Sequence, residues 1–295
     1  MTTGTLTYYL GCPVWACDKW KGTLYTSTAP HHSWLSQYAS VFGTVEGNST
    51  FYGLPSLETV RRWAESVPAG FRFALKFPRT ISHDLRLLNA QAETQRFLDV
   101  LAVLHEAGCL GPSFLQLPRG FSPHHLGDLA EYLHKLPRDF PYAVEVRHRE
   151  FFDEASHESA LDDLLTELHI DRVIFDSRAL FSAPPNDSFE VESQRRKPNL
   201  PVHQSITWRH PILRFVGRNE LERNLPWIHE WALKIAGWMK AGLHPFVFTH
   251  CPDERFAPQF ARMFHDELTR HVEVAEMPRW PGEVEPHPPK QMELF

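Results

Sequence analysis

A group of ionisable residues, Glu145, Arg147 and His148, lies at the end of a short apolar stretch that begins at Tyr142. The apolar residues favour a strand, and Pro141 prevents a helix from continuing into it. Because side chains alternate along a strand, Glu145 and Arg147 share one face. An acid, a guanidinium and an imidazole are costly to bury at a strand end without partners. The stretch therefore predicts either a paired charge network or a site for proton transfer and anion binding.

Other polar residues follow short apolar runs in the same way. The catalytic candidates among them are Glu46, Lys76, Glu145 and Asp176. Alternation predicts that Lys76 shares an inward face with Ala74, and that Asp176 shares one with Ile174. Carboxylates beside a lysine or arginine can divide the roles of acid and base when their pKa values differ. A desolvated lysine can act as a base, form a Schiff base with a carbonyl, or hold an anionic group.

A second set of residues has side chains suited to binding a substrate. Polar candidates are Asn48, Gln116, Arg147, His148, Arg214 and His250, and aromatic candidates for stacking on a sugar or base are Trp15, Phe51 and Tyr52. Six arginines also follow the apolar runs, at 79, 119, 149, 178, 218 and 255. They either form a cationic collar that binds phosphate or carboxylate, or neutralise nearby acids in structural ion pairs.

A divalent metal held by Glu46, Glu145, Asp176 and His250 is a further option for the same residues. Neighbouring cations oppose it, and the spacing contains no paired-ligand motif. The sequence therefore assigns no metal ligand and no firm cofactor.

The elements that position these residues are eight short apolar runs, most of them separated by helix-like segments. The runs lie at 8–11, 44–48, 71–76, 114–117, 172–176, 212–215 and 245–250, with the stretch from Tyr142 as the fifth. Helices are expected at 32–39, 56–66, 90–107, 126–134, 159–168, 225–241 and 258–270. This alternation predicts an α/β fold with parallel strands, a single (β/α)8 barrel of the TIM type, whose strand ends share one opening. A doubly wound open sheet is the alternative, but no Gly-rich loop follows the first run.

The domain organisation expected is one barrel domain over residues 1–280 and a Pro-rich, flexible tail over 281–295. A long irregular insert at 181–208, after the sixth run, suits a lid, a binding loop or a mobile segment. The net charge of −6 gives no general reason to expect nucleic acid or an acidic membrane as a partner. With no signal peptide or membrane-spanning run, we expect a soluble, cytoplasmic protein. The four cysteines lack C-x-x-C spacing and are expected to be free, mostly buried thiols.

Several of these segments resemble the YecE-like family, also called domain of unknown function 72. The resemblance is carried by Gly11–Trp15, Val45–Tyr52, Gly70–Lys76, Leu115–Pro118 and Glu145–His148. It implies a TIM-type barrel and little about activity, since the family is described only as sugar-isomerase-related. The chain departs from the family pattern at Cys12-Pro13, at Arg214–Gly217 and at Phe248–His250. The seventh and eighth strand ends are therefore the least safe to interpret by resemblance.

The last five residues resemble the bacterial sliding-clamp binding peptide. Met292, Leu294 and Phe295 would bury apolar side chains in a groove, and Gln291 would supply hydrogen bonds. Alternatively, the end folds back onto the barrel, or the match arises by chance.

Three hypotheses for function follow. The first is an enzyme of isomerase, lyase or hydrolase type that uses acid–base chemistry on a small, anionic, sugar-like substrate such as a phosphosugar. The second is a DNA-associated processing or repair protein recruited by the sliding clamp through Gln291–Phe295. The third is a barrel that binds a ligand without catalysis.

Overall fold

Parallel strands form the centre of the molecule in the computed structural model, which describes residues 7–153 and 155–285. The strands are β1 (Tyr9–Gly11), β2 (Thr44–Gly47), β3 (Arg72–Leu75), β4 (Ser113–Gln116), β5 (Tyr142–Glu145), β6 (Asp171–Asp176), β7 (Ile212–Val216) and β8 (Phe246–His250). Each of the eight runs expected from the sequence is a strand, and every strand pair is parallel. The α/β class is therefore confirmed.

Hydrogen bonds divide these strands into two sheets. Six strands form a curved sheet in the order β1-β8-β7-β6-β5-β4, and β2 pairs with β3. Isolated bridges from Phe73 to Leu110 and from Lys76 to Phe114 connect the β3 region to β4. The closed eight-stranded barrel expected from the sequence is not confirmed.

The junction between β1 and β2 passes through a tyrosine hydroxyl. The Cys12 N–H donates to Tyr38 Oη at 2.7 Å, and this hydroxyl donates to the Thr44 carbonyl at 2.9 Å. One direct backbone bond also connects them, from Glu46 N–H to the Cys12 carbonyl at 3.1 Å. A Cβ on Gly11 would lie only 2.0 Å from the Thr44 oxygen, so the close approach requires glycine at this position. The Tyr38 hydroxyl thus replaces part of the backbone hydrogen bonding between β1 and β2.

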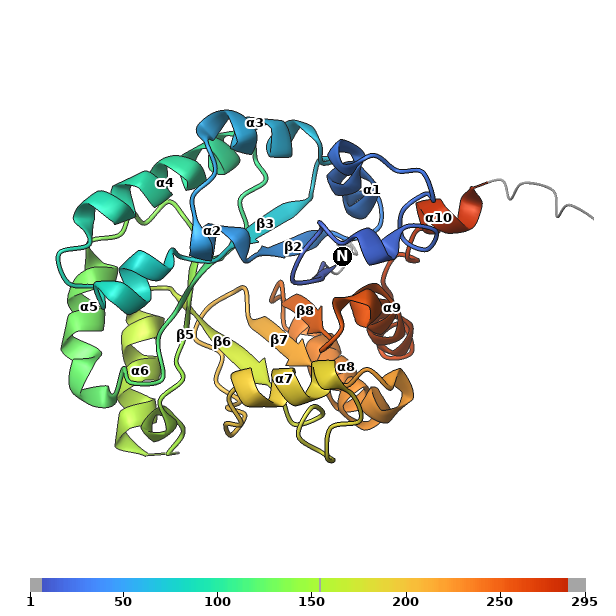
Figure 1. The fold of residues 1–295 in the computed structure, drawn as a ribbon. Coiled ribbons are helices and arrows are strands. Elements are labelled where there is room, and N and C mark those ends of the chain that lie inside the picture. The colour runs from blue at the N-terminus through green and yellow to red at the C-terminus, as the bar shows by residue number, and fades with distance from the viewer. Residues whose placement is uncertain (1–6, 154, 286–295) are drawn as a thin grey trace, which may run out of the picture.

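Helices surround the strands (Figure 1). The long ones are α3 (Leu57–Glu65), α4 (Gln91–Glu106), α5 (Leu126–His134), α6 (Ser156–Glu167), α8 (Leu225–Lys240) and α9 (Ala257–Leu268), together with the shorter α1 (Trp34–Ala39) and α2 (Ser49–Tyr52). All but α2 lie where the sequence predicted helices, within about three residues at each end. Single turns lie at Asp18–Trp20, His31–Ser33, Pro123–His125, Arg149–Phe152, Leu221–Asn224 and Glu254–Phe256, and a π-helical turn, η3, spans Thr80–Asp84.

The insert at 181–208 contains a helix that the sequence did not predict, α7 (Ser188–Arg196). Asp187 caps its start by accepting the Glu190 N–H at 2.8 Å. Glu190 is the buried residue of the helix and binds Arg218 beyond β7, while Ser177 beyond β6 donates to the Pro198 carbonyl. The insert therefore packs beside the ends of β6 and β7, as Figure 1 shows. The helix was missed because it is anchored by a buried charge and has no apolar stripe.

The first residues of the segment expected to be a flexible tail are helical. Residues Pro281–Val284 form α10, whose Glu283 binds Arg262 at 2.6 Å. Gly282 lies so close to the body that an added Cβ would be 2.3 Å from the Thr23 carbonyl. The folded body therefore extends through residue 285. The clamp-binding peptide expected at Gln291, Met292, Leu294 and Phe295 lies outside the described residues and stays a prediction.

Alternate residues along the strands separate into two apolar layers. The inner layer consists of Ala74, Phe114, Ala143, Val173, Ile212, Phe246 and Phe248. The outer layer packs against the helices and includes Val45, Phe73, Leu75, Val144, Ile174, Leu213, Phe215 and Val247. The four cysteines are buried and unbridged, as expected. Within the described part of the chain, every helix is too short or too polar to cross a bilayer.

The Tyr38 junction gives a test of the fold. Replacing Tyr38 with Phe removes the hydroxyl that pairs a buried N–H and a buried carbonyl, and leaving such groups unpaired costs about 1–3 kcal/mol. We expect Tyr38→Phe to lower the free energy of unfolding by that amount in urea titrations. Tyr52→Phe is the matched control, since Tyr52 is 84% exposed and should change stability by less than about 0.5 kcal/mol. Equal effects of the two substitutions would contradict this role for Tyr38.

Candidate functional site

A buried guanidinium lies between two buried carboxylates at the ends of the strands. Arg214 on β7 donates two hydrogen bonds to Glu46 on β2, at 2.8 and 2.7 Å. Its third bond reaches Glu145 on β5 at 2.5 Å. The three side chains are only 3%, 0% and 1% exposed. Arg214 therefore joins the two-stranded sheet to the six-stranded sheet through charge-assisted bonds.

Other polar side chains complete this cluster. His250 on β8 lies with its Nε2 3.0 Å from Glu46 Oε2, and Asn48 donates to Glu46 Oε1 at 2.6 Å. Arg147 donates to Glu145 Oε1 at 2.6 Å. Each carboxylate is thus shared between Arg214 and at least one further donor. We call Glu46, Glu145, Arg147, Arg214 and His250, with the lysines described next, the strand-end cluster.

Strand alternation explains why these residues meet. Glu145 follows Ala143 of the inner layer at the two-residue spacing, and Arg214 follows Ile212 in the same way. His250 likewise follows Phe248. The intervening Val144 and Leu213 belong to the outer layer, and the intervening Thr249 donates to the Ala257 carbonyl of α9. The apolar pattern that stabilises the sheets therefore directs the polar side chains inward.

The electrostatics of the cluster keep both carboxylates ionised. Burial alone would raise the pKa of Glu46, but Arg214 and His250 outweigh it and hold that pKa well below its ordinary value. For Glu145, the opposing effects of Arg147 and Arg214 exceed burial and lower its pKa to about 2. Burial lowers the pKa of His250 to about 4, so its ring is neutral at pH 7. A neutral ring with the proton on Nε2 would be a donor to Glu46.

Two lysines face the same charges without a carboxylate of their own. Among the described residues, neither Lys76 Nζ nor Lys197 Nζ has a hydrogen bond or ion pair. Lys76 lies over the Phe51 ring at 3.9 Å, and Lys197 lies 6.0 Å from the centre of the Phe175 ring. Burial, followed by repulsion from Arg214, lowers the pKa of Lys76 to about 7 and that of Lys197 to about 8. Since the arginines already occupy Glu46 and Glu145, these carboxylates attract the lysines only at longer range, and Glu254 also interacts electrostatically with Lys197.

Uncharged groups line the same strand ends. Gln116 pairs in register with Glu145, is 5% exposed, and its amide has no hydrogen bond within the described chain. The Phe175 ring lies against Arg147 at 5.3 Å and Arg214 at 5.6 Å. The strand-end cluster is therefore bordered by one amide without a hydrogen bond, that of Gln116, and by two aromatic faces, those of Phe51 and Phe175.

Asp176 does not join the cluster, so its expected inward direction is wrong. It lies on the outer face of β6 with Ile174, where Trp231 Nε1 of α8 donates to it at 2.7 Å and Arg178 binds it at 2.7 Å. Phe175 is the inward residue at this strand end. Because Val173, Ile174 and Phe175 are all apolar, the pattern of β6 does not indicate which face is inside.

Three predicted binding residues also lie apart from the cluster. Trp15 packs edge-on against Trp63 of α3, with ring centres 5.1 Å apart, in the layer between helices and strands. Tyr52 is 84% exposed. His148 accepts the Glu150 N–H at 3.4 Å and has no described contact with the cluster. The structure brings together Glu46, Asn48, Phe51, Lys76, Gln116, Glu145, Arg147, Arg214 and His250.

Sequence reasoning missed Lys197 and Phe175. Lys197 comes from the C-terminal end of α7, in the insert at 181–208. The only signal was a run of three cations before Pro198, and nothing in it shows where the insert folds.

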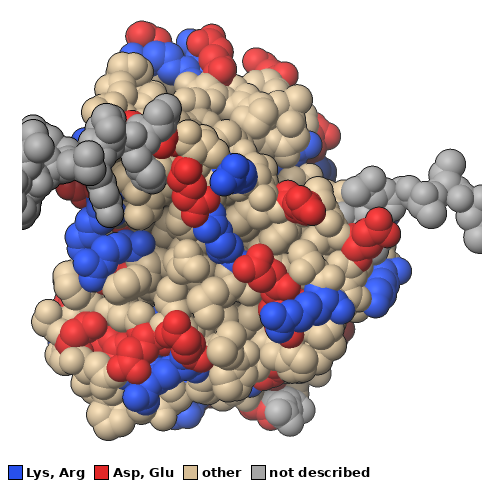
Figure 2. Space-filling model, turned by 90° about the vertical axis from the view of Figure 1, so that its right-hand side faces the viewer, with Lys and Arg blue, Asp and Glu red and all other residues tan. Residues whose placement is uncertain are grey.

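The arginines expected to form a collar are mostly used in ion pairs. Arg79 pairs with Asp84, Arg178 with Asp176, Arg218 with Glu190 and Arg255 with Asp253. Arg119 instead donates to the Arg196 carbonyl. Figure 2 shows the side of the molecule that lies on the right in Figure 1, where cationic and anionic side chains are interspersed. Arg79, Arg178, Arg218 and Arg255 therefore form structural ion pairs, which was the second of the two alternatives from the sequence.

The four residues considered for a divalent metal do not fit that role. Asp176 lies on the outer face of β6, and the Arg214 guanidinium occupies the space between Glu46 and Glu145. A cation held by these carboxylates would have to displace Arg214.

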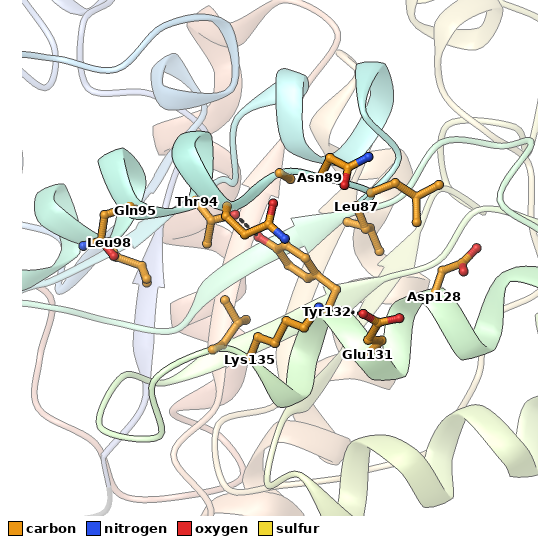
Figure 3. A pocket seen from close by; sticks show the side chains of 13 residues that line it. Leu87, Asn89, Thr94, Gln95, Leu98, Asp128, Glu131, Tyr132 and Lys135 are labelled. Carbon is orange, nitrogen blue, oxygen red and sulfur yellow. Dashed lines mark hydrogen bonds and ion pairs between the residues drawn. The ribbon is translucent and has the colours of Figure 1, made fainter.

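Several cavities lie outside the cluster, and two of them are relevant here. One of about 540 Å³ is lined by Phe51, Tyr52, Gly53, Leu54, Pro78, Arg79, Thr80, Asp84, Glu93 and Arg96, so Phe51 contacts both this cavity and Lys76. Another, of about 370 Å³, lies between the start of α4 and α5, where Thr94 and Tyr132 hydrogen-bond at 2.9 Å (Figure 3). It contains no residue predicted for the site, and its Lys135 is paired with Glu131.

Comparisons with known proteins all lead to one protein family. Residues 9–284 match the family model described as "Protein of unknown function DUF72". The chain is 36% identical over 274 residues to the UPF0759 protein YecE of Escherichia coli K12, covering 92% of this chain and 97% of that protein. The same protein of E. coli O157:H7 matches equally, at 36% over 274 residues.

Solved structures show the same fold. A DUF72 family protein of Enterococcus faecalis V583 superposes with a TM-score of 0.68 at 19% identity, over 92% of this chain and 98% of that one. A DUF72 family protein of Thermotoga maritima MSB8 gives a TM-score of 0.64 at 22% identity, over 89% and 99%.

Loss of Arg214 should destabilise the protein strongly. Arg214→Met leaves two buried carboxylates without their shared cation, and breaking a buried pair in this way costs about 3–5 kcal/mol. The matched control is Arg195→Met, which breaks an ion pair with Glu192 whose arginine is 70% exposed and should cost less than about 1 kcal/mol. Urea unfolding of both variants measures the difference. A loss below about 1 kcal/mol for Arg214→Met would contradict the assigned role.

The depressed pKa of Glu145 predicts a specific pH dependence. Its ordinary pKa of 4.5 falls to about 2 on folding, so the unfolded chain binds more protons between these values. The stability contributed by ionised Glu145 is therefore complete above pH 4.5 and declines as pH falls towards 2. Glu145→Gln lacks this contribution at every pH. The difference in unfolding free energy between the two proteins should shrink from pH 5.5 to pH 3, and a constant difference would contradict the shift.

Proposed function

The chain belongs to the DUF72 family of YecE-like proteins, and we propose that it is an enzyme that uses acid–base chemistry on a small, anionic, sugar-like substrate. The proposed site is the strand-end cluster. We also propose that the two sheets act as one TIM-type barrel, joined through Tyr38 on one side and the β3–β4 bridges on the other.

The observation that carries the proposal is the charge balance of the cluster. Four cations, Lys76, Arg147, Lys197 and Arg214, surround two carboxylates, Glu46 and Glu145. A third carboxylate, Glu254, interacts electrostatically with Lys197, so the group still has a net charge of +1 (four cations, three carboxylates) when all of these side chains are ionised. A buried or partly buried lysine without a counter-ion costs free energy. A bound anion would supply that counter-ion, and a phosphate or carboxylate group fits this requirement.

The proton-transfer role is assigned to Lys76. A general acid or base works best with a pKa near the working pH, and the pKa of Lys76 is about 7. Glu46 and Glu145 stay ionised at neutral pH and are bonded to arginine, so they hold Arg214, Arg147 and His250 in place rather than donate protons. An arriving anion would raise the pKa of Lys76 and bring it into its protonated form for donation.

The uncharged groups favour a substrate with hydroxyl groups. The Gln116 amide has no partner and can both donate and accept a hydrogen bond. The Phe51 and Phe175 rings supply apolar faces of the kind that stack on sugars. Lys197 approaches from α7, so the insert would cover a bound ligand from the side of β6 and β7.

Thermal melting with candidate ligands tests this function. A ligand that binds only the folded state at about 100 times its dissociation constant stabilises it by about 2.7 kcal/mol. We expect sugar phosphates to raise the melting temperature of the wild-type chain by several degrees, and the neutral parent sugars to leave it unchanged. Lys76→Met and Lys197→Met should each abolish most of the shift.

Lys135→Met is the matched control, because Lys135 is 56% exposed and pairs with Glu131 on α5. It should retain the full shift. Equal stabilisation by neutral and phosphorylated sugars, or a full shift in Lys76→Met, would contradict an anion site at the cluster. Stabilisation by a sugar phosphate that is never converted would support the ligand-binding alternative over an enzyme.

A further inference from the structure

Three side chains of types that can ligate a metal meet on α8, at the end of α9 and in the turn that follows α9. They are His229, Glu267 and His271, whose ligand atoms all lie within 4.8 Å of one another. We propose that they form a binding site for one divalent transition-metal ion of the Zn²⁺ type. No motif in the sequence predicted it, because His229 is 38 residues from Glu267.

Helix packing creates the convergence. Glu267 lies in the last turn of α9, and His271 lies four residues further on, in the turn that follows the helix. His229 comes from the first turns of α8, which packs on α9 through apolar residues that include Ile228, Trp231 and Phe264. The His229 and His271 ring centres are 5.3 Å apart. The positions of His229 and Glu267 therefore depend on the packing of α8 against α9, and His271 follows directly from the end of α9.

The hydrogen bonds within the group already orient the ligand atoms. Glu267 Oε1 lies 2.6 Å from His229 Nδ1 and 3.0 Å from His271 Nε2. Both nitrogens thus point at one carboxylate oxygen. A metal ion about 2.0–2.2 Å from each ligand could enter between them after a small rotation of His229, whose side chain is 58% exposed.

The charge state of the group also suits a metal. The Glu267 carboxylate lies against the two imidazoles and one guanidinium, so it has no neighbouring anion among its bonded partners. Arg270 binds the other oxygen, Oε2, at 2.6 Å and leaves Oε1 facing the two imidazoles. Partners of this kind fix the orientation of a metal ligand. The positive charge of Arg270 lies near the proposed metal and opposes the binding of a cation. Solvent screens this charge, because the Arg270 side chain is 71% exposed.

The ligand set predicts which ions bind. Two imidazoles and one carboxylate suit Zn²⁺, Co²⁺, Ni²⁺ and Cu²⁺, whereas Ca²⁺ and Mg²⁺ prefer oxygen ligands. Neutral imidazoles can present a lone pair to the metal by moving their proton to the other ring nitrogen. Three protein ligands leave at least one coordination position for water, on the exposed side of His229. The bound ion would cross-link α8 to α9.

The test uses the full-length chain without an affinity tag, freed of metal by a chelator and dialysed. Calorimetric titration with Zn²⁺ should give one site per chain, and Mg²⁺ should give none. His229→Gln, His271→Ala and Glu267→Gln should each weaken Zn²⁺ binding by at least about 10-fold. Zn²⁺ should also raise the melting temperature of the wild type, and His229→Gln should remove this rise.

His124→Ala is the matched control, since His124 is an exposed histidine on the turn before α5 and outside the group. It should bind Zn²⁺ like the wild type. Circular dichroism and metal-free melting of each variant would show that the fold is kept, and His229→Gln is the safest variant because its side chain is at the surface. Absence of Zn²⁺ binding, or equal binding by the wild type and the His229→Gln and His271→Ala variants, would overturn the proposal.

Discussion

The Arg214 guanidinium, bonded to Glu46 and Glu145, is the interaction on which the rest of this structure depends. Its three bonds connect β7 to β2 and β5, which belong to different sheets. Burying these charges is costly, and the cost is met only because every one of them is paired. The same pairing leaves Lys76 and Lys197 without a direct bond to a carboxylate within the described chain. A requirement of stability at the centre of the fold thus creates the unbalanced charge that we propose receives a substrate.

The two-stranded sheet is held to the six-stranded sheet by polar contacts more than by a continuous ladder. Tyr38 carries the junction at β1 and β2, and Arg214 carries the connection across the interior. Tyr38 bonds to Thr44 and Arg214 bonds to Glu46, and both of these residues are on β2. Strand β2, through which both contacts pass, therefore also supplies the carboxylate for His250 and Asn48. Changes in the site and changes in the contact between the two sheets are expected to be coupled.

The sequence predicted the regular parts of this fold because apolar periodicity determines them. All eight strands and the long helices were found, and the inward directions of Lys76, Gln116 and His250 followed from their apolar neighbours two residues earlier. Asp176 was misplaced because β6 is apolar on both faces and alternation then gives no direction. Helix α7 was missed because a buried Glu190–Arg218 pair anchors it instead of apolar residues. Lys197 and the Tyr38 junction depend on contacts between distant segments, which local patterns do not encode.

The most direct test of the central claim is the pKa of Lys76, measured by NMR titration of the chain with isotope-labelled lysine side chains and assigned with Lys76→Met. The account predicts a pKa of about 7 in the free protein, caused by burial and by Arg214. It also predicts a rise when inorganic phosphate is added, because the anion would supply the missing counter-ion. A pKa near the ordinary lysine value of 10.5, unchanged by phosphate, would show that Lys76 already has its charge compensated and would contradict the account.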